Sequence, residues 1–177
     1  MKLNSAMLRQ TIPTDEDKQK IKHNPIYFIL DNVLDTYNIG SLFRLADAVA
    51  AEKIFLCGEC ETPPSTRITK AAIDTEKWVN WEYRKSAVEV ARELKKQNIM
   101  IVILEQDAKS QPYDKINYQF PVAIVVGNET YGVSREVLDV SDAIAEIPMH
   151  GINVSLNVVV SSGILVYETV KHLDKSQ

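Results

Sequence analysis

The sequence contains few cysteines and histidines, and this scarcity excludes several kinds of site. Of 177 residues, only two are cysteines and three are histidines. Cys57 and Cys60 form one C-x-x-C pair, which supplies only two of the four ligands that a structural zinc ion needs. A thioredoxin-type pair would place its second cysteine at the start of a helix, whereas Pro63 and Pro64 follow shortly. We therefore expect two reduced thiols without a catalytic role. We also expect no metal site, because the histidines, at positions 23, 150 and 172, are not spaced as metal ligands.

Long apolar runs and an excess of positive charge are also lacking. No run approaches the ~20 residues of a membrane span. The first twenty residues contain no signal-peptide apolar core, so we expect a cytoplasmic protein with no membrane partner. Lysine and arginine total 20 against 24 acidic residues, a net charge of −4. This balance argues against a non-specific nucleic-acid coat but is compatible with an RNA enzyme that has a local basic patch.

Apolar residues make up 45% of the chain and form short runs that alternate with amphipathic stretches. The runs lack polar alternation, which is typical of strands buried on both faces. This pattern predicts an α/β domain with a parallel sheet covered by helices on both faces. The expected strands are 25–30, 53–57, 78–82, 99–104, 122–126 and 143–147, and the expected helices are 39–51, 68–73, 86–97, 133–140 and 156–172.

Residues 1–24 are polar and mixed in charge, and we expect them to form an arm that precedes a single domain at 25–177. The arm is either frayed or an extension that touches RNA. The expected helix 156–172 is apolar on nearly every side, which predicts that it is largely buried. Ser155 suits its N-cap position. Serine and asparagine at the start of a buried helix, next to a glycine loop, indicate a place for chemistry.

Common nucleotide-binding signatures are absent. Gly127 and Gly132 have the glycine spacing of a phosphate-binding P-loop, but Val133 and Ser134 follow where that loop requires lysine. No G-x-G-x-x-G motif follows the first expected strand, and no serine lies in a G-x-S-x-G turn. These absences disfavour a standard kinase, ATPase, dinucleotide enzyme or hydrolase.

Polar residues instead gather after the expected strands. Asn38 and Arg44 flank the start of helix 39–51, and apolar neighbours predict that Arg44 is partly buried. Arg44 either pairs with a carboxylate such as Asp47 or Glu129, or binds an RNA phosphate with its forked donors, and the spacing favours neither. Glu129 follows a strand and a glycine, where ligand-binding loops lie in parallel sheets.

Three segments together resemble the motifs of the SpoU family in the SPOUT superfamily of RNA methyltransferases. The first runs from Asn38 to Arg44 as NIGSLFR and is followed by ADA. The second is VGNETYGVS at 126–134. The third comprises IPMHG at 147–151 and SLNV at 155–158. The likeness covers about residues 25–173. It departs from the family pattern at Ala50–Ala51, where glycine is usual, and at Val159, where serine is frequent.

The resemblance implies a parallel α/β sheet whose C-terminal third forms a deep trefoil knot. It also implies that S-adenosylmethionine binds in the knot and that the enzyme is a homodimer with active sites near the subunit interface. The reaction would be methyl transfer to a ribose 2′-hydroxyl of RNA. Carried over by position, the cofactor-binding residues are Leu104, Gly127, Ile147, Met149 and Leu156, and the catalytic residues are Arg44, Asn38, Glu129, Ser155 and Asn157.

In this interpretation Arg44 binds the phosphate next to the methylated nucleotide and lowers the proton affinity of the hydroxyl. Asn38 and Asn157 orient Arg44 and the substrate loop. Ser155 fixes the knot loop or bonds the ribose. Glu129 anchors the motifs and is a candidate partner of Arg44. Whether Arg44 serves its own subunit or its partner's stays open.

The substrate is less well indicated. Only about two dozen residues precede the first strand and little follows the last helix, and compact members of this kind commonly act on tRNA. We therefore expect tRNA, with rRNA as the alternative. A non-catalytic knotted protein that only binds RNA and a nucleotide-binding protein of another class are the rival interpretations. Candidate RNA contacts are Lys2, Arg9, Arg67, Lys70, Arg84, Lys85 and Arg135, although solvated surface charge accounts for most of them.

Overall fold

The structure is a computed structural model that describes residues 13–173 of the chain. Its centre is a seven-stranded sheet with the order β3-β2-β1-β6-β4-β7-β5, in which every pairing is parallel. This confirms the predicted α/β class. The strands are β1 Asn24–Asp31, β2 Ala51–Cys57, β3 Trp81–Arg84, β4 Met100–Leu104, β5 Gln111–Pro112, β6 Val122–Gly127 and β7 Ala143–Glu146.

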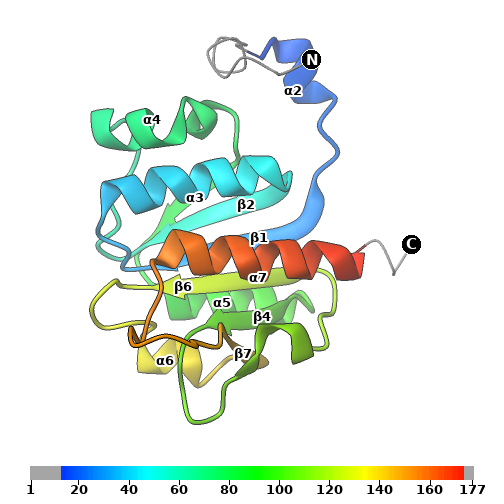
Figure 1. Ribbon diagram of the computed structural model, residues 1–177. Coiled ribbons are helices and arrows are strands. Elements are labelled where there is room, and N and C mark those ends of the chain that lie inside the picture. Colours follow the sequence, from blue (N-terminus) through cyan, green and yellow to red (C-terminus); the bar gives the residue numbers. More distant parts are fainter. Residues whose placement is uncertain (1–12, 174–177) are drawn as a thin grey trace, which may run out of the picture.

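Helices cover both faces of the sheet (Figure 1). Along β1, Phe28 packs with α3, α4 and α7 on one face, and the next residue, Ile29, packs with α5 and α6 on the other. The α-helices are α2 Asp15–Gln19, α3 Thr36–Ala48, α4 Thr66–Ala72, α5 Ala87–Lys96, α6 Arg135–Leu138 and α7 Val158–Leu173, and two 3₁₀ turns are η1 Thr75–Lys77 and η2 Tyr113–Lys115.

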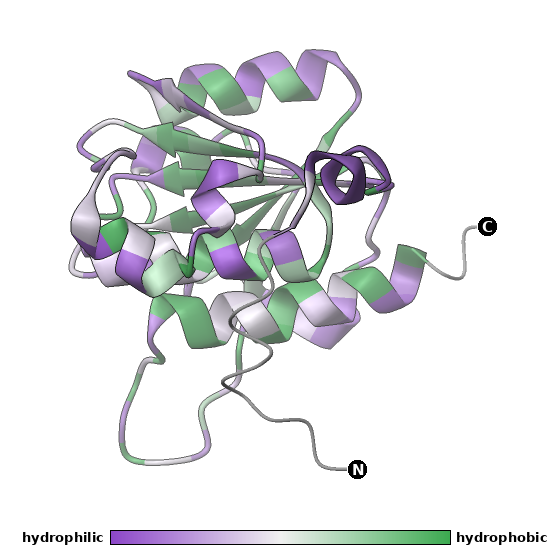
Figure 2. Ribbon diagram, turned by 90° about the horizontal axis from the view of Figure 1, so that it is seen from above, coloured by the Kyte–Doolittle hydropathy of each residue, from purple (hydrophilic) through white to green (hydrophobic). Residues whose placement is uncertain are grey.

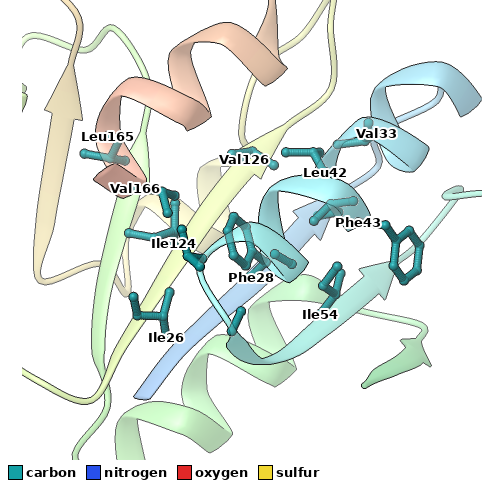
Figure 3. Packing of buried hydrophobic residues seen from close by; sticks show 14 of the residues in the cluster. Ile26, Phe28, Val33, Leu42, Phe43, Ile54, Ile124, Val126, Leu165 and Val166 are labelled. Atoms are coloured by element: carbon teal, nitrogen blue, oxygen red, sulfur yellow. The ribbon is translucent and has the colours of Figure 1, made fainter. Parts of the chain in front are cut away.

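The larger hydrophobic core lies between the sheet and the layer of α3, α4 and α7. Phe28, Leu42 and Ile124 are fully buried there, and Leu165 of α7 completes the contact (Figure 3). Complete burial of such a side chain contributes about 1.5–3 kcal/mol. Viewed from above, the strands at the centre are largely hydrophobic, and the helices around them contain both hydrophobic and hydrophilic residues (Figure 2). The core on both faces of the sheet therefore holds the strands in place, and the candidate site lies at the carboxyl ends of three of them.

The helices begin one to three residues from the predicted positions, and α4 and α6 begin at Thr66 and Arg135 instead of residues 68 and 133. The differences at α3 and α7 concern the candidate site. Helix α3 begins at Thr36 instead of residue 39, because the Asp35 carboxylate accepts from Tyr37 N at 2.7 Å and caps the helix. Helix α7 begins at Val158 instead of residue 156. Asn157 Oδ1 accepts from Val159 N at 2.9 Å, so Asn157 caps this helix and the prediction of Ser155 as the cap is wrong.

The predicted burial of the last helix is also wrong in part. Val160 and Tyr167 are each 52% exposed, whereas Ser162, Leu165 and Val166 are buried. One side of α7 packs on the sheet, and the other side presents apolar residues to solvent. Packing within this chain therefore does not explain why Val160 and Tyr167, on the outer side of α7, are apolar.

Other features lie outside what the sequence indicated. The short edge strand β5 was not predicted, and β3 begins three residues later than expected, at Trp81. Within the arm, Thr14 caps the five-residue helix α2. In the described part of the chain, no helix has the length and apolar character needed to cross a membrane. The trefoil knot stays a prediction.

Candidate active site

A cavity of about 550 Å³ lies where the carboxyl ends of β4, β6 and β7 meet. Ligands in parallel α/β sheets bind outside these strand ends, and the volume suits a nucleoside-sized molecule. The cavity is lined by all of the predicted cofactor-binding residues, which are Leu104, Gly127, Ile147, Met149 and Leu156. Glu129, Ser155 and Asn157 line it as well. The fold thus brings residues from three distant segments of the chain into one pocket.

One wall of the cavity is the tight turn at 127–134, after β6. Asn128 and Gly132 exchange backbone hydrogen bonds of 3.0 and 2.9 Å, and Asn128 Oδ1 accepts from Thr130 N and Tyr131 N. A side chain at Gly127 would overlap the backbone of Gly132 and Val133, so the chain can fold back only over glycine. The glycine spacing that resembled a P-loop therefore serves this turn.

Glu129 joins this turn to the start of α3. Its Oε1 accepts from Asn38 Nδ2 at 2.9 Å and from Asp35 N at 3.1 Å, and its Oε2 accepts from Leu34 N at 3.1 Å. Burial raises the pKa of Glu129, but the bonds from Asn38 and the backbone outweigh it, and the net pKa lies below the ordinary value. Glu129 is therefore an ionised anchor.

Asn38 connects the first and third motifs. It is buried, and its Oδ1 accepts from Asn157 Nδ2 at 3.1 Å while its Nδ2 donates to Glu129. A row of hydrogen bonds runs from Glu129 through Asn38 to Asn157. It links the loop after β6 to the first turn of α3 and to the start of α7. The predicted grouping of these residues is present, although neither asparagine contacts Arg44.

The environment of Arg44 differs from the one predicted. Arg44 is exposed rather than partly buried, and it does not line the cavity. Within residues 13–173 it makes no ion pair, because Glu129 is occupied as described and Asp47 accepts from Trp78 Nε1 at 2.7 Å. The structural alternative of a carboxylate partner is therefore wrong for both candidates. Leu42 and Phe43 are fully buried, and Arg44, which follows them in α3, lies on the exposed side of the helix.

Two residues directly after β4 contact the walls of the cavity and were not predicted from the sequence. Glu105 Oε2 accepts from Val133 N at 2.9 Å, and Gln106 Nε2 donates to Val154 O at 2.8 Å. Both residues line the cavity. Their position after a buried strand is the same signal that identified Glu129, so the rule on strand ends would have found them.

The cavity lining has an acidic character. Glu105, Glu129 and Glu146 contribute carboxylates, and no lysine or arginine is among the lining residues of the described chain. Such a lining attracts a cationic ligand and repels the phosphates of a nucleotide.

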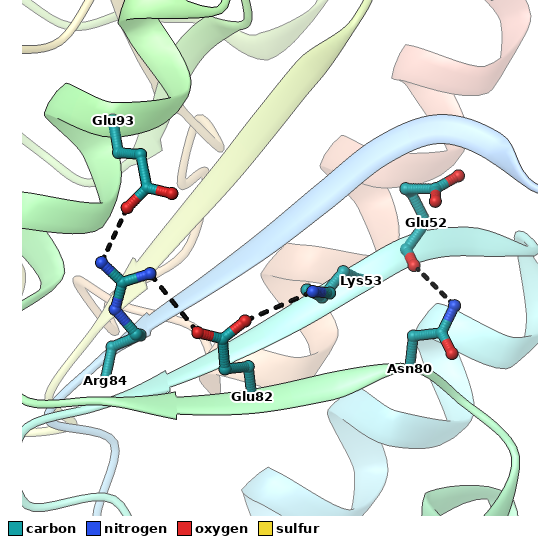
Figure 4. Close-up of polar contacts among 6 residues, drawn as sticks. All are labelled: Glu52, Lys53, Asn80, Glu82, Arg84 and Glu93. Carbon is teal, nitrogen blue, oxygen red and sulfur yellow. Dashed lines mark hydrogen bonds and ion pairs between the residues drawn. The ribbon is translucent and has the colours of Figure 1, made fainter.

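The predicted RNA-contact residues that the structure describes lie outside the cavity lining, and two of them belong to structural ion pairs. Arg84 contacts Glu93 at 2.7 Å and Glu82 at 3.4 Å, and Glu82 also contacts Lys53 (Figure 4). Arg135 pairs with Asp139 at 3.2 Å on α6. Arg67, Lys70 and Lys85 are exposed. Lys2 and Arg9 lie outside the described residues.

The two cysteines are buried free thiols. Burial raises the pKa of Cys57 to about 12 and that of Cys60 to about 11, so neither is a nucleophile at neutral pH. Residues 13–173 contain no group of three or more potential ligands that could hold a metal ion.

Solved structures with the same architecture define the class of fold. The crystal structure of the TrmH/SpoU tRNA modifying enzyme of A. aeolicus superposes with a TM-score of 0.80 at 28% identity, covering 90% of this chain and 80% of that one. The AdoMet-bound rRNA methyltransferase of Sinorhizobium meliloti superposes with a TM-score of 0.78 at 30% identity, covering 86% and 58%. The architecture is therefore that of the SpoU-type methyltransferases.

The chain belongs to the SpoU rRNA Methylase family, whose profile matches residues 25–167. Among curated proteins, it is 29% identical over 157 residues to the 23S rRNA (guanosine-2′-O-)-methyltransferase RlmB of Ralstonia nicotianae, covering 89% of this chain and 63% of that protein. It is 31% identical over 146 residues to the tRNA (guanosine(18)-2′-O)-methyltransferase of Aquifex aeolicus, covering 82% and 68%. The chain spans about 60% of the length of the first curated relatives, 63% of one and 59% of the next.

Proposed function

We propose that this protein is an S-adenosylmethionine-dependent methyltransferase that modifies a ribose 2′-hydroxyl of RNA. The observation that carries the proposal is the convergence of the second and third motif segments on one cavity, where Asn38 of the first segment is bonded to Glu129 and Asn157 of the lining. The names of the relatives support the same reaction, since those of Ralstonia nicotianae and Aquifex aeolicus are both guanosine 2′-O-methyltransferases.

The residues of the cavity fit this cofactor. Leu104, Ile147 and Leu156 offer apolar surface for a nucleoside, and strand-end and loop backbone is accessible beside them. S-adenosylmethionine has a sulfonium and an ammonium group, and the carboxylates of Glu105, Glu129 and Glu146 complement both charges. When bound, the cofactor supplies an electrophilic methyl group. ATP or NAD would bring phosphates next to the same carboxylates, so these ligands are disfavoured.

Arg44 is the residue proposed to act on the RNA. Its guanidinium has no ion-pair partner within residues 13–173, so it is available to hold two oxygens of a phosphate next to the reacting ribose. A guanidinium with a pKa above ~12 is a poor base. Arg44 would therefore orient the ribose and lower the proton affinity of its hydroxyl, and the proton would leave to phosphate or water. Orientation of this kind can supply ~7–11 kcal/mol of catalysis.

We also propose that the protein is a homodimer. The outer side of α7 and the loop before it expose the apolar residues Ile152, Val154, Leu156, Val160 and Tyr167. Burial of this surface against a second copy would stabilise the dimer. It would also allow Arg44, which does not line the cavity of its own chain, to serve the cavity of its partner.

RNA is the proposed class of substrate, and the relatives' names divide between rRNA and tRNA. The expectation of tRNA stays a prediction with rRNA as its alternative, as does the cytoplasmic location. The arm at 1–24 and the domain at 25–177 are proposed as the two parts of the chain.

The function is tested first by binding and then by transfer. Calorimetry with S-adenosylmethionine, ATP and NAD should show binding of the first alone. Mass spectrometry of ribose-methylated nucleosides, in separately purified tRNA and rRNA from a deletion strain, should show one methylated nucleoside missing. Binding of RNA without any methyl transfer would favour the non-catalytic alternative.

The role of Arg44 is tested by Arg44→Ala, with Arg44→Lys as the matched variant. Arg44→Ala should abolish transfer while the Kd for S-adenosylmethionine stays within about twofold, and Arg44→Lys should retain part of the activity because it keeps one positive charge. If Arg44 acts in the partner's site, mixing Arg44→Ala with Ser155→Ala subunits should restore some activity. A kcat for Arg44→Ala equal to that of the wild type would contradict the role.

A further inference from the structure

Segment 147–156, between β7 and α7, forms one wall of the cavity and has very few polar contacts. Its ten residues make a single hydrogen bond to other segments of the described chain, which is the bond from Gln106 Nε2 to Val154 O at 2.8 Å. The remaining bond, from Val154 N to Asn153 Oδ1 at 2.9 Å, lies within the segment. The other backbone groups of the segment, apart from the amide and the carbonyl of Val154, are therefore left to solvent.

Burial does not hold this segment either. None of its residues is buried, and Ile152 and Val154 are 103% and 73% exposed. The loop before α7 stands out from the body of the molecule (Figure 2). Even so, Ile147, Met149, Asn153, Ser155 and Leu156 all line the cavity. This segment contributes five residues to the cavity lining, as many as the turn at 127–134, and it is positioned by its two ends and by Gln106.

Gln106 lies at a suitable place for this contact. It follows Glu105, whose carboxylate binds Val133 N in the opposite wall of the cavity. Two consecutive residues at the end of β4 therefore reach the two walls. The end of β4 is itself fixed, because Glu105 N donates to Ala145 O at 3.1 Å and the strand lies between β6 and β7. A fixed strand end thus determines the position of Val154.

We propose that Gln106 is a positioning residue for cofactor binding, which holds segment 147–156 in the conformation that closes the cavity. The proposal rests on the proposed function, because it assigns a residue that positions one wall of the same cofactor site. A single exposed hydrogen bond biases a loop equilibrium by about fivefold. When the closed conformation is populated less, the apparent affinity falls by the same factor, because the ligand binds only the competent fraction.

The test compares Gln106→Leu, which keeps the size but removes the donor, with Gln106→Lys, which restores a donor. Gln97→Leu is the matched control, since Gln97 is an exposed glutamine at the end of α5, outside the cavity. We expect Gln106→Leu to raise the Kd and the KM for S-adenosylmethionine by up to about fivefold, and the full factor applies where the open segment predominates in the wild type. The kcat at saturating cofactor should stay within about twofold, and Gln106→Lys should recover most of the affinity.

A second measurement uses the protein without cofactor. Thermolysin cuts before large apolar residues, so it can cleave at Ile152, Val154 and Leu156 in the open segment. Cleavage of Gln106→Leu within 147–156 should be faster than in the wild type by up to about fivefold, with an unchanged Tm, and the factors by which the Kd and the cleavage rate rise should multiply to about fivefold. The Gln97→Leu variant should be cleaved at the wild-type rate.

The outcomes separate the two proposals. If wild type fails to bind S-adenosylmethionine, the proposed function fails, and the cleavage rates still decide whether Gln106 holds the segment. Equal Kd and equal cleavage for wild type and Gln106→Leu would overturn the positioning role. So would an affinity loss in Gln106→Lys as large as in Gln106→Leu, or a fivefold fall in kcat at unchanged KM.

Discussion

The two walls of the cavity are built in opposite ways. The turn at 127–134 is fixed by bonds to Asn32, Glu105 and Asp31, in addition to its own backbone pair. Segment 147–156 has one bond to other segments of the described chain and no buried residue. A ligand between them would meet one preorganised surface and one that must be ordered on binding. Affinity in such a site depends strongly on how far the second wall is ordered beforehand.

Hydrogen exchange should give the largest contrast between the walls. The amides of Asn128, Gly132, Val133 and Ser134 are bonded, so we expect them to exchange at least about 1,000-fold more slowly than unbonded amides of 149–153. The measurement is residue-resolved exchange on the protein without cofactor. Similar protection from exchange in both walls would contradict the difference in order between the turn at 127–134 and segment 147–156.

Paired glycine substitutions should give the next largest effect. Gly127→Ala places a Cβ against the backbone of Gly132 and Val133, and we expect a loss of about 3 kcal/mol in the free energy of unfolding. A Cβ at Gly151 meets no atom within 4 Å, so Gly151→Ala should change stability by less than about 0.5 kcal/mol. Urea denaturation of both variants tests this. A tolerated Gly127→Ala would show that the turn is adaptable.

Asparagine substitutions should give a smaller difference in stability between the two walls, again with the larger loss in the turn at 127–134. Asn128→Asp keeps the acceptor for Thr130 N and Tyr131 N but loses the donor to Asn32 O, which should cost about 1 kcal/mol. Asn153→Asp keeps the acceptor for Val154 N and should be close to neutral. Thermal unfolding compares the two variants. An equal loss in both would mean that the bond to Asn32 contributes nothing.

The smallest expected effect is the pH dependence contributed by Glu129. Its folded pKa lies below the ordinary 4.5, so its contribution to stability is present above that value and is lost as the pH falls through the folded pKa. Wild type should therefore exceed Glu129→Gln in stability near neutral pH, and the difference should shrink under acid conditions. Unfolding of both proteins across this range measures it. A constant difference at every pH would contradict an ionised anchor.

Much of the fold was predictable because buried parallel strands have a simple sequence pattern. Continuous apolar runs predicted β1, β4 and β6 to within about a residue, since both faces of each strand are covered. The starts of α3 and α7 were predicted less well, because capping by Asp35 and Asn157 depends on side-chain geometry that neighbouring polar residues can equally supply. Strand β5 has two residues, which is too short for any pattern.

The sequence by itself determined the α/β class and, through its motifs, part of the cavity lining, because strand patterns and motif residues are local features of the chain. Only the tertiary structure decided which of them touch. It placed Glu129 on Asn38 rather than on Arg44, left Arg44 exposed, and gave Glu105 and Gln106 their contacts with the two walls. These outcomes depend on the packing of helices and strands that lie far apart in the sequence, and no local pattern specifies that packing.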